Sequence, residues 1–259
     1  MLHSMGELAL DSSAELVLDN RLGMGGVLVP RPSEYEALVK RKRAEFAHLA
    51  PQYDLQCLIA SAGRIKSLRR KLARMARSEV QGPVLELCCG TGGVTVELAK
   101  HFDHVIAVDL SPDMLARNER RLARAGVKNV TLLEAEVSTL RFPQGAFSAV
   151  VISLGLHELP KWIREKVFSD AARWLGRGGR FVMCDYSKPK NRVLAALFSW
   201  IGRLLIEEEH FDEYLGHGMQ ERLRHHGFEL VEQQHQFLSC LELSAWTLPT
   251  GAGSPSAFR

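Results

Sequence analysis

The stretch that decides the fold is VLELCCGTGGVTVELAK, which runs from Val84 to Lys100. It reads as an apolar strand, then a glycine-rich turn, then a helix pattern. Gly90, Gly92 and Gly93 allow backbone conformations and close approaches that a Cβ atom would obstruct. Turns between such a strand and helix commonly hold nucleotide-like ligands, although a purely structural turn gives the same pattern. What this turn holds therefore decides most of the function.

The composition indicates an ordinary soluble protein. The chain has 259 residues, of which 46% are hydrophobic and 24% charged, enough for one large core with additions. A net charge of +3 gives no general attraction to nucleic acids or membranes. The five cysteines lack C-x-x-C spacing, which favours a reducing cytoplasm over disulfides or zinc. We find neither a signal-peptide pattern nor an apolar run of about eighteen residues, and expect a cytoplasmic protein.

Strand-like and helical segments alternate from Pro83 onward. This alternation implies right-handed crossovers and helices on both faces of a parallel sheet. The sequence predicts an α/β fold with a doubly wound, mostly parallel, seven-stranded Rossmann-like sheet and an antiparallel C-terminal strand. Ser111 and Pro112 are expected to cap and begin one helix. The expected strands lie near 83–87, 104–109, 130–134, 147–152 and 179–185, with two more between 228 and 246; the expected helices between them lie near 94–101, 112–125 and 161–175.

We expect three parts along the chain. Residues 1–32 are predicted to be a flexible arm, 33–248 one α/β domain, and 249–259 a disordered tail. Within the domain, residues 33–80 are expected to form a helical cap, and 190–226 helices on the substrate side, near 191–206 and 212–225. One cap helix should bury a single apolar stripe, made of Ile65, Leu68, Leu72 and Met75.

Three acidic residues are expected near the ends of successive strands, facing one cleft. Asp109 is placed to accept hydrogen bonds from two ribose hydroxyls. Glu86 can meet a positively charged amino group, and Glu136 an adenine amino group. Each acid alone is as well explained as a solvated strand end. Together they favour a nucleoside that carries an amino acid, as in S-adenosylmethionine, over NAD, because nothing is arranged for a pyrophosphate.

Five motifs, in order, resemble those of class I S-adenosylmethionine-dependent methyltransferases: VLELCCGTGG, VIAVDLSPDML, LLEAEVSTLRF, AFSAVVISLGLHEL and WLGRGGRFVMCDYSKP. The stretch FAHLAPQYDLQCLIASAG also resembles the opening segment of the C-methyltransferases of ubiquinone and menaquinone biosynthesis. The likeness spans roughly residues 45–190. It implies that 33–248 is a methyltransferase domain that uses S-adenosylmethionine on a small lipophilic or aromatic, quinone-like acceptor.

The resemblance also implies which residues contact the cofactor. Cys88 stands where the family has glycine or another small residue, and is expected to pack beneath the methionine portion. A bulky residue at Gly92 is expected to exclude the cofactor and leave the fold largely intact. No metal is expected. The implied cofactor-binding residues are Tyr53, Glu86, Cys88, Gly90, Thr91, Gly92, Asp109, Leu110, Glu136, Val137 and Ser153.

The acceptor side departs from the quinone branch, which carries Arg-Asn where this chain has His157 and Glu158. Because imidazole can take a proton near neutral pH, we expect His157 to be a catalytic base; the alternative is that it only packs a loop. Cys57 also replaces an expected asparagine. Two rival functions are a nucleic-acid methyltransferase and a non-catalytic S-adenosylmethionine-binding protein. The first is disfavoured because residues 153–156 lack the prolines of the base-amino motif.

Three further segments allow more than one interpretation. The basic run over residues 64–77 fits RNA phosphates or, more often, the solvated back of a helix. The acidic cluster over 207–212 lacks metal-ligand spacing. The apolar segment over 193–206 is expected to be a substrate lid, a homodimer face or a peripheral membrane contact.

Overall fold

The computed structural model describes residues 33–61, 63–189, 191, 214–215, 218–237 and 239–249. The expectations for the arm over 1–32, the apolar segment over 193–206, the acidic cluster over 207–212 and the tail from 250 onward lie outside these residues. Among the residues that are described, no helix is long and apolar enough to cross a membrane.

One seven-stranded sheet forms the centre, with strand order β3-β2-β1-β4-β5-β7-β6. β1 pairs in parallel with both β2 and β4, so the winding reverses beside β1. β7 is antiparallel to both β5 and β6. The predicted fold class is confirmed. The strands are β1 Val84–Leu87, β2 Val105–Asp109, β3 Val130–Glu134, β4 Phe147–Ser153, β5 Leu175–Tyr186, β6 Glu229–Gln236 and β7 Leu241–Thr247.

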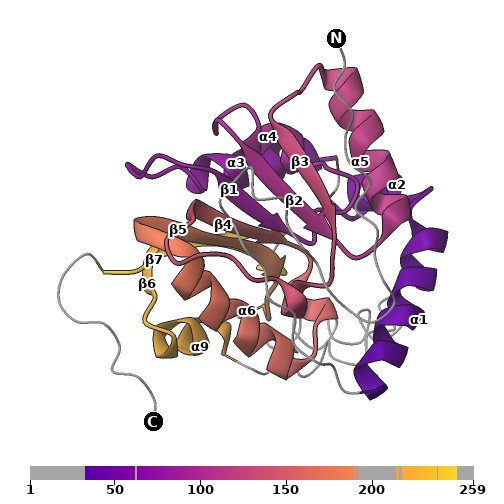
Figure 1. Ribbon diagram of the computed structural model, residues 1–259. Helices are drawn as coiled ribbons and strands as arrows, with labels where there is room; N and C mark the ends of the chain where they lie inside the picture. Colours follow the sequence, from indigo (N-terminus) through magenta and orange to yellow (C-terminus); the bar gives the residue numbers. More distant parts are fainter. Residues whose placement is uncertain are drawn as a thin grey trace.

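Helices cover both faces of the sheet (Figure 1). Side chains alternate along the strands, so Leu85 and Leu87 join one core with α6, whereas Val84 joins the other core with α3. The predicted apolar stripe of α3 is buried as expected. The helices are α1 Ser33–Leu49, α2 Tyr53–Ala60, α3 Ile65–Met75, α4 Thr95–Leu98, α5 Pro112–Ala125, α6 Lys161–Trp174 and α9 Met219–His225.

Local signals set some helix ends and not others. Ser111 caps α5 by accepting a hydrogen bond from the Met114 amide at 3.3 Å, which confirms the prediction. The helix expected over 94–101 has one α-helical turn, because Lys100 and His101 then donate three residues back, which tightens the chain. Of the helix expected over 212–225, Tyr214 and Leu215 are helical, and Gly218, with a left-handed φ of 53°, separates them from α9, which begins at Met219.

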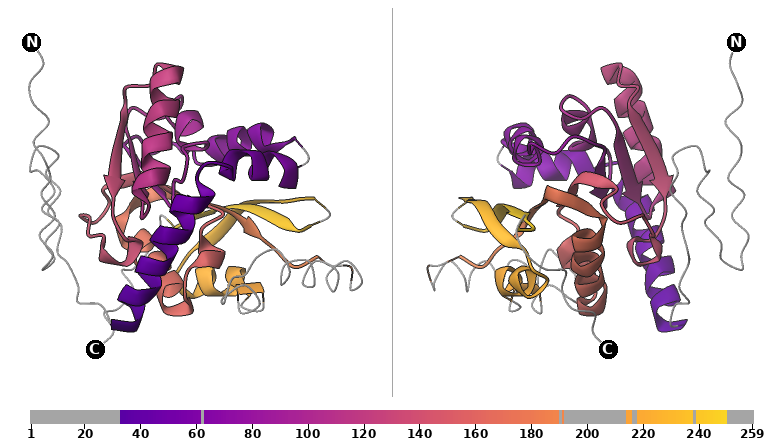
Figure 2. Two further views of the ribbon diagram at one scale, coloured as in Figure 1. Left: turned by 90° about the vertical axis from the view of Figure 1, so that its right-hand side faces the viewer. Right: turned by 60° about the vertical axis from the view of Figure 1, so that its left-hand side comes forward.

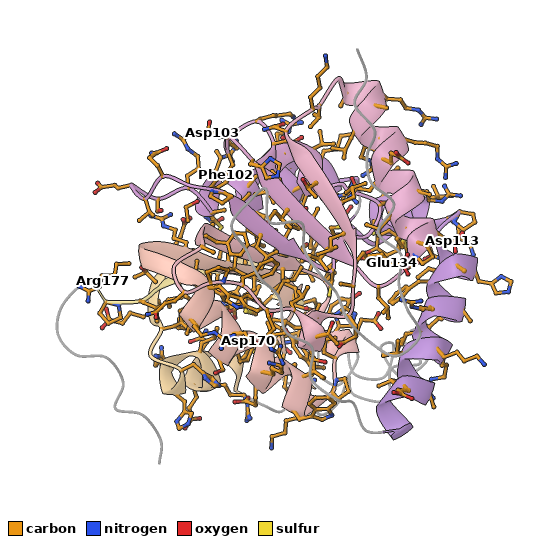
Figure 3. All side chains as sticks on the ribbon, in the orientation of Figure 1. Phe102, Asp103, Asp113, Glu134, Asp170 and Arg177 are labelled. Atoms are coloured by element: carbon orange, nitrogen blue, oxygen red, sulfur yellow. The ribbon has the colours of Figure 1, made fainter. Side chains whose placement is uncertain are left out.

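Helix α1 lies beside the carboxyl ends of the first strands. Figure 3 shows Glu134, the last residue of β3, and Asp113, in the first turn of α5, close to α1. Phe102 and Asp103, which precede β2, lie on the opposite side of the molecule (Figure 3). An ion pair of 3.0 Å between Arg43 and Glu134 attaches α1 to this end of the sheet. The turned views show α1 crossing this side and α2 and α3 as a neighbouring pair of helices (Figure 2).

Candidate active site

A cavity opens where the carboxyl ends of β1, β2, β3 and β4 meet α1 and α2. Ligands of doubly wound sheets bind at this position, where the winding reverses. Its wall is built from the turn after β1, the end of β2, the segments that follow β3 and β4, and one side of α1. The lining residues are Leu38, Val39, Lys42, Phe46, Tyr53, Cys88, Gly90, Asp109, Leu110, Met114, Glu136, Val137, Leu154, Gly155, Glu158, Leu159 and Pro160.

The predicted cofactor residues divide into two groups. Tyr53, Cys88, Gly90, Asp109, Leu110, Glu136 and Val137 line the cavity. Glu86, Thr91, Gly92 and Ser153 are not among the lining residues and lie behind or beside them. The second group can support the wall, whereas the first can touch a ligand.

Asp109 fixes the glycine turn from the end of β2. Its Oδ2 accepts a hydrogen bond from the Gly90 amide at 2.7 Å, and its Oδ1 accepts one from the Ser111 amide at 2.9 Å. Burial raises the pKa of Asp109, although these backbone donors oppose the rise. Each carboxylate oxygen keeps a second lone pair, so this cavity-lining group can also accept from ligand hydroxyls.

Gly92 serves the packing of the turn. Its φ is +80°, and a Cβ atom there would lie 2.0 Å from Oδ1 of Asn118. Asn118 is fully buried and donates to Oγ1 of Thr95 at 3.1 Å and to Sγ of Cys89 at 3.4 Å, which ties α5 to α4 and to the turn. The expectation that a bulky residue at Gly92 would spare the fold is therefore wrong, because the first clash is with the protein interior.

Glu86 is buried in β1, with 2% of its surface exposed. Burial raises its pKa to about 8, with Asp109 adding to the rise and a hydrogen bond from Thr95 opposing it. Among the described residues, no group hydrogen-bonds to Oε2 of Glu86. A carboxyl with this pKa is mostly neutral at pH 7, and a cationic ligand group nearby would stabilise its ionised form. The amino group of an amino acid portion would be such a cation.

Glu136 lies two residues beyond the end of β3, so it does not close that strand as expected. It caps the short 3₁₀ helix η2, Val137–Thr139, by accepting from the Ser138 amide at 2.9 Å and from the Ser138 hydroxyl. Glu136 and Val137 both line the cavity. The position suits the base of a nucleoside.

An ionic network that the sequence did not reveal holds the outside of the turn. Asp54, in the first turn of α2, accepts from Oγ1 of Thr91 at 3.1 Å and pairs with Arg69 and Arg121. Burial works against ionisation of Asp54, but the two arginines outweigh it and lower its pKa. Gly93 leaves room for Arg69, since a Cβ there would lie 2.1 Å from the guanidinium carbon. Arg69 belongs to the basic run over residues 64–77, and the sequence pattern of that run did not predict its ion pair with Asp54.

Cys88 has a left-handed φ of 54°, a conformation that glycine adopts most readily. It packs against Gly155, where a Cβ atom would lie 2.7 Å from the Cβ of Cys88. Burial raises the pKa of the Cys88 thiol well above its usual value, and the carboxylates of Asp109 and Glu158 add to the rise. The thiol therefore stays neutral and acts as a small packing group. Within the described part of the chain, no group of three or more His, Cys, Asp or Glu side chains can hold a metal ion.

His157 lies in the short 3₁₀ helix η3, Leu156–Glu158, and is buried beneath the cavity wall. Its Nδ1 lies 2.7 Å from Oδ1 of Asp185, and its Nε2 lies 3.5 Å from Oε1 of Glu158. Burial alone would lower its pKa, but Asp185 and Glu158 raise it to about 10. A protonated imidazole cannot take a proton, so this geometry does not fit the expected base. Lys42, which sequence reasoning missed, and Glu158, which it named only as the neighbour of His157, line the cavity instead.

A cavity at the winding reversal, with a carboxylate at the end of β2 and a glycine turn after β1, is shared by Rossmann-like nucleotide-binding proteins, among them the class I S-adenosylmethionine-dependent methyltransferases. The family profile described as "Methyltransferase domain" matches residues 84–179. A demethylmenaquinone methyltransferase from Thermus thermophilus is 33% identical over 155 residues, covering 59% of this chain and 69% of that protein. The ubiquinone/menaquinone biosynthesis C-methyltransferase UbiE from Geobacter sulfurreducens is 28% identical over 165 residues, covering 62% and 64%.

A solved structure gives the same fold. The crystal structure of a putative methyltransferase from Bacillus halodurans has a TM-score of 0.55 at 23% identity, covering 65% of this chain and 71% of that one. The chain belongs to the S-adenosylmethionine-dependent methyltransferase family that includes the demethylmenaquinone and ubiquinone/menaquinone C-methyltransferases. It is a methyltransferase, and its cofactor is S-adenosylmethionine.

Proposed function

We propose that this enzyme methylates a small, lipophilic aromatic acceptor of the quinol type. The observation that carries the proposal is the part of the cavity wall that α1 and the segment after β4 form. Leu38, Val39, Phe46, Leu159 and Pro160 make this wall apolar, and the ion pair of Lys42 with Glu158 lies within it. Such a surface suits a flat apolar ring with a polar substituent. The names of the two quinone-pathway relatives support the same class of acceptor.

We propose cofactor-binding roles for several of the lining residues, supported by their positions in the cavity wall. Asp109 accepts from the ribose hydroxyls, and Leu110, Met114 and Val137 pack against the base. Cys88 and Gly90 lie along the methionine portion. The cofactor supplies a methyl group that its sulfonium already activates. Alignment of two reactants can contribute about 7–11 kcal/mol, so the chain's main task is positioning.

We propose a positioning role for His157 in place of the base. Its ion pair with Asp185 and the hydrogen bond from the Leu156 amide to Oδ2 of Asp185, at 2.8 Å, hold η3 against β5. Glu158 is thereby fixed at the cavity wall.

A cytoplasmic location remains a prediction from the cysteine usage.

The test is an assay with S-adenosylmethionine and a reduced, short-chain demethylmenaquinone whose ring carbon is free. We expect S-adenosylhomocysteine to form together with one product that is a methyl group heavier, with the new methyl on the ring carbon by mass spectrometry and NMR. The matched control is the same quinol with that carbon already methylated, which should give no product. Equal turnover of both quinols, or methylation of tRNA in a parallel reaction, would contradict the proposal.

A further inference from the structure

One face of α1 turns toward the cavity. Leu38, Lys42 and Phe46 follow each other at intervals of four residues and therefore share this face. Lys42 is the charged member of the three, and only 8% of its surface is exposed. Its exposed neighbour Lys40 is not among the lining residues. An ammonium group thus lies in an apolar wall of the reaction cavity.

The partners of Lys42 fix its position. Its Nζ lies 2.7 Å from Oε2 of Glu158 and 3.3 Å from Oε2 of Glu45, and 5.9 Å from the centre of the Phe46 ring. The ion pair with Glu158 connects residues 116 positions apart in the sequence. Buried ion pairs add little net stability over apolar packing, because desolvation opposes the attraction. The pair is therefore poorly explained as a means of holding α1 alone.

The pair continues into the protein as a row of alternating charges. Glu158 lies between Lys42 and His157, and His157 pairs with Asp185 at 2.7 Å. Asp185 is fully buried. Because Lys42 and Glu158 line the cavity while His157 and Asp185 lie behind them, the row presents its ammonium end to a bound molecule.

We infer that Lys42 binds the oxygen atom of the methyl acceptor, a hydroxyl on the aromatic ring, and favours its ionised form. This inference rests on the proposed function for the kind of acceptor. An ammonium group stabilises a nearby oxyanion, and the ionised oxygen enriches the adjacent ring carbon in electrons. The carbon–sulfur bond then breaks with its electron pair left on sulfur, the ring supplies the pair for the new carbon–carbon bond, and one proton leaves to water.

Glu158 is the counter-ion of Lys42 in this arrangement. Glu45 from α1 itself and Glu158 from η3 face Lys42, and His157 and Asp185 lie behind Glu158. A ring hydroxyl that meets Lys42 would share the ammonium group with Glu158. A methoxy group in the same place cannot ionise, so its interaction with Lys42 adds much less to the binding affinity.

Binding measurements test the inference without requiring methyl transfer. Calorimetry with S-adenosylhomocysteine present compares 1-naphthol with 1-methoxynaphthalene on the wild type, Lys42→Met and the exposed control Lys40→Met. We expect the wild type and the control to prefer the hydroxyl compound on the order of tenfold, as one charge-assisted hydrogen bond allows, and Lys42→Met to lose most of this preference. The absorbance of bound 1-naphthol should also show ionisation at lower pH in the wild type than in Lys42→Met.

Two further variants separate recognition from folding. Lys42→Arg should restore part of the preference, and the double variant Lys42→Met/Glu158→Gln, which removes both charges, should still lack it. Binding of S-adenosylhomocysteine reports that each variant is folded. A preference that survives in Lys42→Met, or a wild type that binds neither compound, would overturn the inference. Tight, Lys42-dependent binding without methylation of the quinol would instead overturn the proposed function.

Discussion

The two halves of the cavity, which we assign to the cofactor and to the acceptor in our proposal, are built in different ways. The cofactor half uses backbone groups and a strand-end carboxylate, as where Asp109 accepts from the amides of Gly90 and Ser111. The acceptor half uses side chains from distant segments, as where Lys42 of α1 meets Glu158 of η3. The first half follows from one strand–turn–helix unit and its neighbours. The second half forms only where α1 packs against the sheet and η3. Its residues can therefore change while the cofactor site stays the same.

The largest effect should come from removing the carboxylate of the cofactor half. Asp109→Ala takes away two charge-assisted hydrogen bonds of about 1.5–3 kcal/mol each, so we expect the affinity for S-adenosylhomocysteine to fall at least tenfold in calorimetry. Asp113→Ala is the control, since Asp113 is an exposed acid at the start of α5. An unchanged dissociation constant would show that Asp109 does not bind the cofactor, and would contradict the assignment of this half of the cavity to the cofactor.

Next in size is the packing of the glycine turn. Gly92→Ala forces a Cβ to within 2.0 Å of Asn118 at a left-handed φ, and we expect a loss of about 2–5 kcal/mol in the free energy of unfolding. Gly126→Ala has a similar φ of +67° with nothing within 4 Å, so it should cost only about 1–2 kcal/mol. Chemical denaturation measures both. Equal losses of unfolding free energy in the two variants would show that only backbone strain matters, and that the Asn118 side chain moves to accommodate the new Cβ atom.

The smallest effect concerns His157 in the acceptor half. Its pKa is raised from 6.5 to about 10, so the folded state holds this proton more tightly than the unfolded state. The resulting stability is fully present below about pH 6.5 and is lost as the pH rises toward 10. His157→Gln should be less stable than the wild type by about 1.5–3 kcal/mol at pH 6, the size of one hydrogen bond to a charged group.

The difference between wild type and His157→Gln should narrow steadily up to pH 10, as followed by thermal unfolding at several pH values. The rate of methyl transfer tests the same residue independently. If His157 were a base, the wild-type rate would rise above about pH 6.5 and the variant would lack that rise. We expect no His157-dependent rise at that pH, because the imidazole remains protonated.

The sequence predicted what local chemistry determines. Alternating apolar runs placed the strands, Ser111 and Pro112 placed the start of α5, and the stripe from Ile65 to Met75 placed the buried face of α3. It failed where a contact depends on how separate segments approach. Asp54 reaches Thr91 across 37 positions and Lys42 reaches Glu158 across 116, and no spacing in the chain signals either contact. His157 looked like a base because its buried partner Asp185 lies 28 positions away on another strand.

Calorimetric titration with S-adenosylhomocysteine, S-adenosylmethionine and NAD tests the central claim most directly. The account predicts that both sulfur compounds bind with one site per chain, and that NAD gives no binding heat because the cavity has no place arranged for a pyrophosphate. Binding of NAD without binding of either sulfur compound would contradict it.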